Sequence, residues 1–88
     1  MLHVKKLMYI SGKRLWVLFD DGASGEIDLE GKLSGPVFEP LKDDSKFSEL
    51  YLDEESETVS WPNGADLAPE FLKQVMIEQA AAVQQMQG

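Results

Sequence analysis

The stretch Trp61-Pro62-Asn63-Gly64-Ala65-Asp66-Leu67 joins a strand-rich front part of the chain to a helical C-terminal part. Its proline has no N–H to donate to a β-ladder, so we expect the preceding strand to end at Trp61. Its Asn-Gly pair tolerates the positive φ angles of a tight turn. Asp66 can accept hydrogen bonds from nearby backbone N–H groups and is expected to cap the helix that follows. The stretch therefore predicts a strand, a turn and a helix in succession.

Three segments upstream have the period and composition of β-strands. Apolar and polar residues alternate in residues 2–10 and 23–29, whereas residues 14–19 are apolar on both faces. Gly22 follows two aspartates and supplies the positive φ that a tight hairpin needs. The simplest arrangement of these segments is a three-stranded antiparallel meander.

The period of two also predicts which side chains of these strands share a face. In the first strand one face collects Leu2, Val4, Met8 and Ile10. Lys6 interrupts that face, which favours a place at the edge of the sheet. In the second strand Trp16 and Leu18 form one apolar face, and the residues that alternate with them form a second apolar face. We therefore expect a central strand covered on both sides.

The middle of the chain predicts a loop, a short helix and a second hairpin. Residues 35–41 contain two prolines and are expected to form a loop with Phe38 inserted into the protein. Residues 42–50 predict a short helix with Asp43 or Asp44 as its N-cap. Two further strands, one on each side of an acidic turn at 54–57, predict a second hairpin.

Strong helix formers continue from Pro69 to the end of the chain. The stripe that would face the sheet contains Leu72, Val75, Met76, Gln79, Val83 and Met86. Residues 79–87 carry no charge, so this end either frays or packs on a second copy as a homodimer. The prediction is an α+β fold in one domain, residues 1–88, with a sheet-rich part at 1–61, a turn at 62–67 and a C-terminal helix at 68–87.

Composition restricts the class of partner. The chain has 16 acidic and 8 basic residues, a net charge of −8, no cysteine and 43% apolar residues. Phosphate neutralisation dominates binding to nucleic acid, so this charge argues against a nucleic-acid partner and favours a basic protein. No apolar run approaches the length that spans a bilayer. The first residues lead into an alternating pattern rather than the apolar run of a secretory leader, so we expect no signal peptide. We expect a cytoplasmic protein without a membrane partner.

The sequence offers no catalytic constellation. His3 stands alone and is expected to be a solvated strand residue. The acidic cluster at residues 53–57 lacks the glycine and the twelfth-position carboxylate of an EF-hand loop and is expected to be a solvated turn. No nucleophile and base can be paired, so we predict no catalytic residue, no metal and no cofactor. The candidates for binding a ligand or a partner are Trp16, Phe38, Trp61, Asn63 and Asp66.

Three strings of residues carry a family resemblance. They are Leu15-Trp16-Val17-Leu18-Phe19-Asp20-Asp21-Gly22 with Ile27-Asp28-Leu29, Gly35-Pro36-Val37-Phe38-Glu39-Pro40-Leu41 with Asp43 and Phe47, and the stretch from Trp61 to Leu67. From residue 1 to about residue 73 the chain resembles the bacterial family called domain of unknown function 2442. It departs from the family at Ala68, where members commonly have aspartate before the proline.

The resemblance implies a small α+β fold with a short antiparallel sheet and no established catalytic residues. Relatives encoded beside small toxin-like proteins imply an antitoxin or accessory role. Together with the charge, this favours a protein-interaction module, an antitoxin-like partner of a basic protein. The alternative is a small-ligand-binding or regulatory domain with a pocket near Trp61 and Asp66, and an enzyme is the least favoured class.

Overall fold

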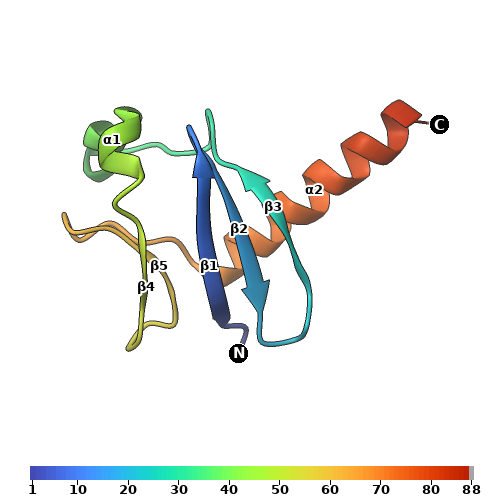
Figure 1. The fold of residues 1–88 in the computed structure, drawn as a ribbon, viewed down its shortest axis with the longest axis horizontal. Coiled ribbons are helices and arrows are strands. Elements are labelled where there is room, and N and C mark those ends of the chain that lie inside the picture. Colours follow the sequence, from blue (N-terminus) through green and yellow to red (C-terminus); the bar gives the residue numbers. More distant parts are fainter. Residues whose placement is uncertain (88) are drawn as a thin grey trace.

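The computed structural model describes residues 1–87, with the side chains of residues 1–82. Strands precede and surround two short helical segments, and one long helix follows (Figure 1). The elements are β1 Val4–Ser11, β2 Arg14–Phe19, β3 Ser24–Asp28, the 3₁₀ helix η1 Pro36–Lys42, α1 Asp44–Phe47, β4 Tyr51–Asp53, β5 Thr58–Ser60 and α2 Pro69–Gln87. The predicted α+β class, with a meander, a second hairpin, a short helix and a longer C-terminal helix, is confirmed.

β1, β2 and β3 form an antiparallel sheet in that order, so β2 is central and β1 lies at an edge, as predicted. The turn after β2 closes where the Phe19 N–H donates to the Ala23 carbonyl at 2.8 Å. Gly22 has a φ of +90° in this turn, a conformation that a residue with a Cβ rarely adopts. The hairpin is therefore fixed by its glycine.

The predicted inward face of β1 is wrong beyond its first residues. The register with β2 shifts between Val4 and Lys6, and again between Tyr9 and Ser11. A bulge adds one residue to a strand, so the side chains after it exchange faces. Leu7 and Tyr9 therefore pack against the core, whereas the Met8 side chain is 60% exposed.

β5 ends just before Trp61 and the predicted turn follows, but this turn also closes a further, smaller hairpin. The Gly64 N–H donates to the Trp61 carbonyl at 3.0 Å, and the Trp61 N–H donates to the Ala65 carbonyl at 2.9 Å. Gly64 has a φ of +91°, which fits a three-residue hairpin loop that ends in a left-handed residue. The chain then runs back along β5, where Asp66 forms a bridge with Ser60.

This return strand corrects the role expected for Asp66. Asp66 is an exposed residue of the bridge, and its side chain accepts no hydrogen bond among the described residues. α2 begins three residues later, at Pro69, and the Ala68 carbonyl accepts from the Leu72 and Phe71 N–H groups. Ala68 has no side-chain oxygen, so the helix begins without a side-chain cap.

Helical structure begins earlier than expected in the middle of the chain. The predicted loop at residues 35–41 is largely η1, with Pro36 in its first turn and Pro40 inside it. Asp43 then caps α1 as predicted, because its Oδ1 accepts from the Ser45 N–H at 3.0 Å. The two hydrogen bonds from Ser45, the side-chain one first, lower the pKa of Asp43 below its ordinary value.

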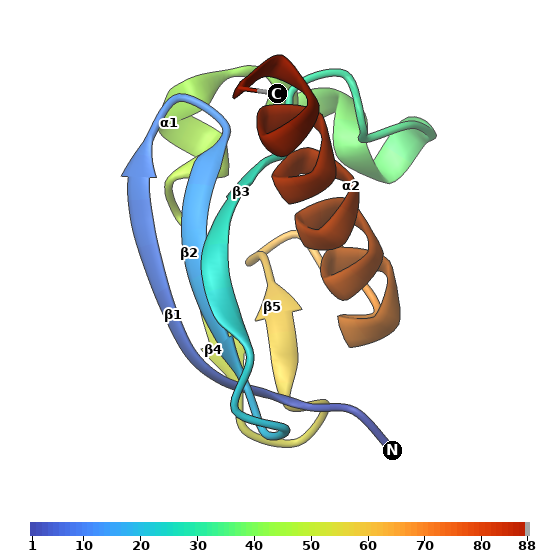
Figure 2. The same ribbon diagram turned by 90° about the vertical axis from the view of Figure 1, so that its right-hand side faces the viewer.

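The core lies between the three-stranded sheet and a layer made of the β4–β5 hairpin and α2. Figure 2 shows β5 and α2 on the same side of the sheet. The buried apolar residues are Val4, Leu15, Val17, Phe19, Ile27, Leu29, Leu41, Phe47, Val59, Trp61, Ala65, Leu72 and Val75. Of the predicted helix stripe, the side chains of Val83 and Met86 lie outside the described residues.

Candidate interaction surfaces

Trp61 is a structural anchor in the core, only 1% exposed. Its indole Nε1–H donates to the Phe47 carbonyl at 2.9 Å, and its ring packs against Phe47 at a centroid distance of 5.5 Å. Phe38 meets the same ring edge-on at 6.3 Å but stays half-buried. The expected insertion of both aromatic rings is thus complete for Trp61 and partial for Phe38.

Asn63 holds the turn to η1. Its Nδ2 donates to the Val37 carbonyl at 2.9 Å, and its Oδ1 accepts from the Ala65 N–H at 3.1 Å. Both ends of the amide are therefore used within the protein. The side chain fixes the Trp61 hairpin against a segment that lies 26 residues earlier in the sequence.

The sequence-predicted site residues do not meet in one cavity. Trp61 and Asn63 border a shallow hollow of about 350 Å³, together with Pro40, Lys46 and Glu49. Asp66 does not line this hollow, because the return strand carries it past the turn. Phe38 packs edge-on against the Trp61 ring and does not line the hollow. Trp16 belongs to a different surface.

Trp16 lies on the outer face of the three-stranded sheet, beside a hollow of about 460 Å³. Met8 and Tyr51, which share that hollow, are 60% and 45% exposed. The expected cover on both faces of β2 is therefore incomplete, since Trp16 and Leu18 are only half-buried. We call the surface formed by Met8, Trp16 and Tyr51 the outer apolar face.

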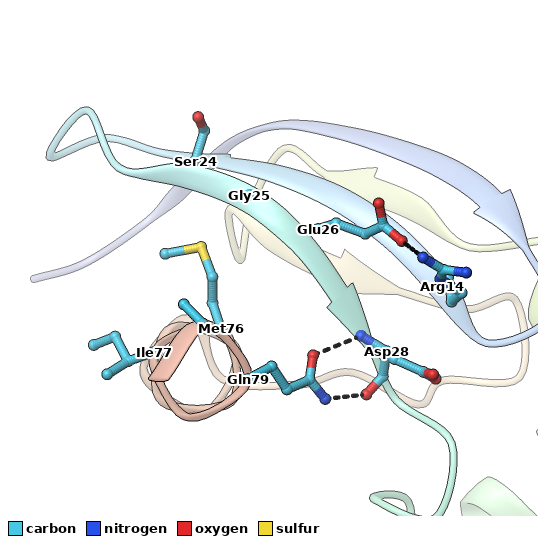
Figure 3. A pocket seen from close by; sticks show the side chains of 9 residues that line it. Arg14, Ser24, Gly25, Glu26, Asp28, Met76, Ile77 and Gln79 are labelled. Atoms are coloured by element: carbon cyan, nitrogen blue, oxygen red, sulfur yellow. Dashed lines mark hydrogen bonds and ion pairs between the residues drawn. The ribbon is translucent and has the colours of Figure 1, made fainter. Parts of the chain in front are cut away.

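A second surface, the β3–α2 groove, was not predicted from the sequence (Figure 3). It is a hollow of about 460 Å³ where α2 crosses the free edge of β3. The residues that define it are Ser24, Gly25 and Glu26 of β3 and Met76, Ile77 and Ala80 of α2. Met76 points toward Gly25, where a Cβ would lie 3.0 Å from the methionine sulfur. The missing side chain of Gly25 therefore lets the helix approach the strand.

Gln79 closes one end of this groove. Its Oε1 accepts from the Asp28 N–H at 2.9 Å, and its Nε2 donates to the Asp28 carbonyl at 2.7 Å (Figure 3). The side-chain amide thus occupies the hydrogen-bonding position that a neighbouring strand would take. This contact was not predicted from the sequence, and the signal that could have indicated it is a polar residue within the apolar stripe of the helix.

His3 links three segments rather than standing alone in solvent. Its Nδ1 lies 3.0 Å from Asp20 Oδ2, and its Nε2 lies 3.0 Å from Glu57 Oε2. A neutral imidazole donates through one nitrogen only, so both contacts become hydrogen bonds when the ring is protonated. Hydrogen bonds from the His3 backbone N–H and then from its ring lower the pKa of Asp20. No serine or threonine hydroxyl among the described residues is hydrogen-bonded to this ring.

The surface charge is predominantly acidic. Four basic side chains are already paired, in the ion pairs Lys13–Asp44, Arg14–Glu26, Lys42–Glu39 and Lys73–Asp21. The net charge of −8 therefore resides in carboxylates that these cations do not neutralise. Within the part of the chain that the structure describes, no group of three or more histidine, cysteine or acidic residues is arranged to hold a metal ion. No helix there combines the length and hydropathy that a bilayer crossing requires.

These features define a small α+β domain with two exposed apolar surfaces. The chain belongs to the family described as "Protein of unknown function (DUF2442)", whose model matches residues 4–74. The match includes the Trp61 hairpin and the first turn of α2, and it ends before Gln79. No curated protein and no solved structure gives a significant match to the chain.

Proposed function

We propose that this protein is an accessory interaction module, an antitoxin-like partner of a basic protein. The observation that carries the proposal is the outer apolar face, where Met8 and Tyr51 are 60% and 45% exposed. Contiguous exposed apolar residues on a small protein mark interaction sites. Trp16 lies among them, and tryptophan and tyrosine are the residues that most often dominate the energy of an interface.

The charge supports a basic partner. Asp53 ends β4, the turn to β5 contains Glu54, Glu55 and Glu57, and β4 borders the outer apolar face. Among the described residues, Lys6 is the one charged residue that lines the hollow itself, so the acidic segment lies beside the apolar face rather than around it. Carboxylates beside an apolar surface accelerate encounter with a cationic surface and disfavour anionic ones. Such attraction is screened by salt.

Co-purification from the native cell, at low and at high salt, tests the proposal. We expect a basic protein to be retained by the wild-type chain and released as salt increases. Met8→Glu should abolish retention, whereas Val37→Glu, which alters another residue that is 43% exposed, should not. A monodisperse chain without a partner at every salt concentration, or equal retention by both variants, would refute the proposal.

A small-ligand role is the second candidate, and the hollow beside Trp61 favours it. Lys46 and Glu49 place one cation and one anion on the rim of this hollow, next to the Asn63 amide. A ligand that binds only the folded state raises the melting temperature by mass action. A metabolite screen by thermal shift distinguishes this role, because a stabilising hit should lose its effect in Lys46→Ala and Glu49→Ala.

A further inference from the structure

We propose that β3 accepts a fourth strand, an extended lysine- or arginine-bearing segment of a partner protein that lies in the β3–α2 groove. The basic character of this segment rests on the proposed function, but the surface is a different one. Addition of a strand to an exposed sheet edge is a general mode of peptide recognition, in which main-chain hydrogen bonds supply affinity and alternate side chains supply specificity.

The hydrogen bonds of β3 show which groups face the open edge. Ala23 and Leu29 bond to β2, through the Ala23 carbonyl and the Leu29 N–H. Bonded and non-bonded pairs alternate along an antiparallel ladder, so Ser24, Glu26 and Asp28 direct their N–H and C=O groups away from β2. Gln79 uses both groups of Asp28. Among the described residues, the outward N–H and C=O groups of Ser24 and Glu26 have no partner.

α2 supplies the floor for such a strand. The helix crosses behind β3 and continues past the edge of the sheet (Figure 1). Its 19 residues make a helix roughly 28 Å long. This length exceeds the width of a sheet of three strands that lie about 4.8 Å apart. Ile77 lies just past the crossing and is 50% exposed, and Ala80 follows one turn later. A strand beside β3 would place every second side chain over these residues.

Charge selects the occupant. A second copy of the chain would bring another net charge of −8 and a second Glu26 to the same edge. Like charges directly opposite each other in a sheet are destabilising, and unlike charges are stabilising. The cation on the groove wall, Arg14, is already paired with Glu26. A basic segment therefore fits this edge better than a second copy does.

Synthetic peptides test strand addition directly. The probe is a heptapeptide of alternating lysine and valine, followed by amide chemical shifts and hydrogen exchange of the full-length protein. We expect shifts centred on residues 24–28 and protection of the Ser24 and Glu26 amides. A peptide in which glutamate replaces lysine should not bind. Equal binding of that acidic peptide would overturn the charge assignment.

Backbone methylation separates a paired strand from a side-chain contact. The N–H groups of alternate peptide residues point to opposite edges, so methylation at all valines blocks one edge and methylation at all lysines blocks the other. Strand addition predicts that one of these two isomers loses binding and the other retains it. Equal binding of both isomers would overturn the proposal.

Two variants at one position provide the matched protein control. Glu26→Pro removes the outward N–H and should weaken binding by up to about tenfold, the effect of one lost hydrogen bond. Glu26→Thr removes the same carboxylate and the same Arg14 ion pair but keeps the N–H, so it should lose only the few-fold contribution of the cross-strand charge pair and bind more tightly than Glu26→Pro. If Glu26→Pro fails to fold, the methylated peptides still decide the question.

The location of the shifts separates this proposal from the proposed function. Shifts centred on Met8 and Trp16 would overturn strand addition and leave an interaction module that uses the outer apolar face. Absence of any shift at the β3–α2 groove would also overturn it. Failure to retain a basic protein from the native cell would overturn the proposed function, whatever the peptides do at the groove.

Discussion

Replacing Ala68 by aspartate should stabilise the protein by supplying the cap that α2 lacks. Pro69 has no N–H, and the N–H groups of Phe71 and Leu72 already donate to the Ala68 carbonyl at 3.0 and 3.2 Å. The Glu70 N–H has no acceptor among the described residues. An aspartate at the N-cap accepts from the second or third helical N–H, which is worth about 1 kcal/mol over alanine.

The same carboxylate gains from the helix dipole and loses to the negative charge around it. The dipole contributes about 0.3–1 kcal/mol, screened by salt, while Glu70 and the net charge of −8 oppose a further anion. We expect a gain of about 1 kcal/mol in the free energy of unfolding, or roughly 4–8 °C in Tm for a domain of this size. Urea and thermal melts at two salt concentrations measure both quantities.

Two further variants separate capping from charge. Ala68→Asn keeps the side-chain acceptor without the charge and should retain most of the gain. Ala82→Asp adds the same charge at an exposed position far from the helix start and should stabilise nothing. If neither Ala68→Asp nor Ala68→Asn raises the free energy of unfolding, Ala68 is not an N-cap with an unpaired Glu70 N–H beside it. That result would refute the prediction.

Four other expectations follow from the contacts. Trp61→Ala should cost about 3–5 kcal/mol and nearly unfold the chain, and a shift of only a few degrees in Tm would contradict this. Asn63 should resist deamidation in mass-spectrometric time courses, because both ends of its amide and the Gly64 N–H are hydrogen-bonded. Stability should fall below about pH 4, because protonation removes hydrogen bonds from carboxylates with pKa values below the ordinary 3.8; acid titration by circular dichroism tests this, and an unchanged urea midpoint down to pH 2.5 would contradict it. These carboxylates belong to Asp20, Asp21, Asp43 and Asp53. Homodimerisation through the C-terminal helix predicts a concentration-dependent mass in sedimentation, and a constant monomer mass would exclude it.

The sign of the pH effect follows from the direction of the shifts. A carboxylate with a lowered pKa in the folded state contributes stability that is complete above its unfolded pKa. That contribution is lost as the pH falls through the folded value. Asp21 illustrates the cause, because the Lys73 ammonium and then the Ala23 N–H stabilise its charged form.

Local pattern predicted most of the fold, because β-strands and turns have short-range signatures. Gly22 and Gly64 stand where the chain has positive φ, and Asp43 caps the helix that it was expected to cap. The period of two failed in β1, because a bulge shifts the alternation by one residue and leaves no mark in the composition. Only the register with β2 shows that Leu7, rather than Met8, faces the core.

Candidate site residues were harder to predict, because they depend on contacts between distant segments. Asp66 has the chemistry of an N-cap, but the hairpin at Gly64 sends the chain back along β5 and gives Asp66 a ladder position instead. Trp16 and Trp61 are both tryptophans in or next to a strand, yet Trp16 is half-buried on the outer face of the sheet whereas Trp61 is buried in the core. Their separation follows from the tertiary arrangement and from no local pattern.

The two edges of the three-stranded sheet differ in how they are protected from pairing with a further strand, and this difference supports an open site at β3. At β1, two bulges disturb the edge, and the Val4 N–H donates to the Glu57 carbonyl at 2.9 Å. Bulges and covering segments are the usual protection of an edge strand. β3 has a regular register along its length, and a side chain, Gln79, covers just one end of it. Charge protects the remainder: Glu26 disfavours pairing with a second copy, while a cationic strand would meet no such repulsion.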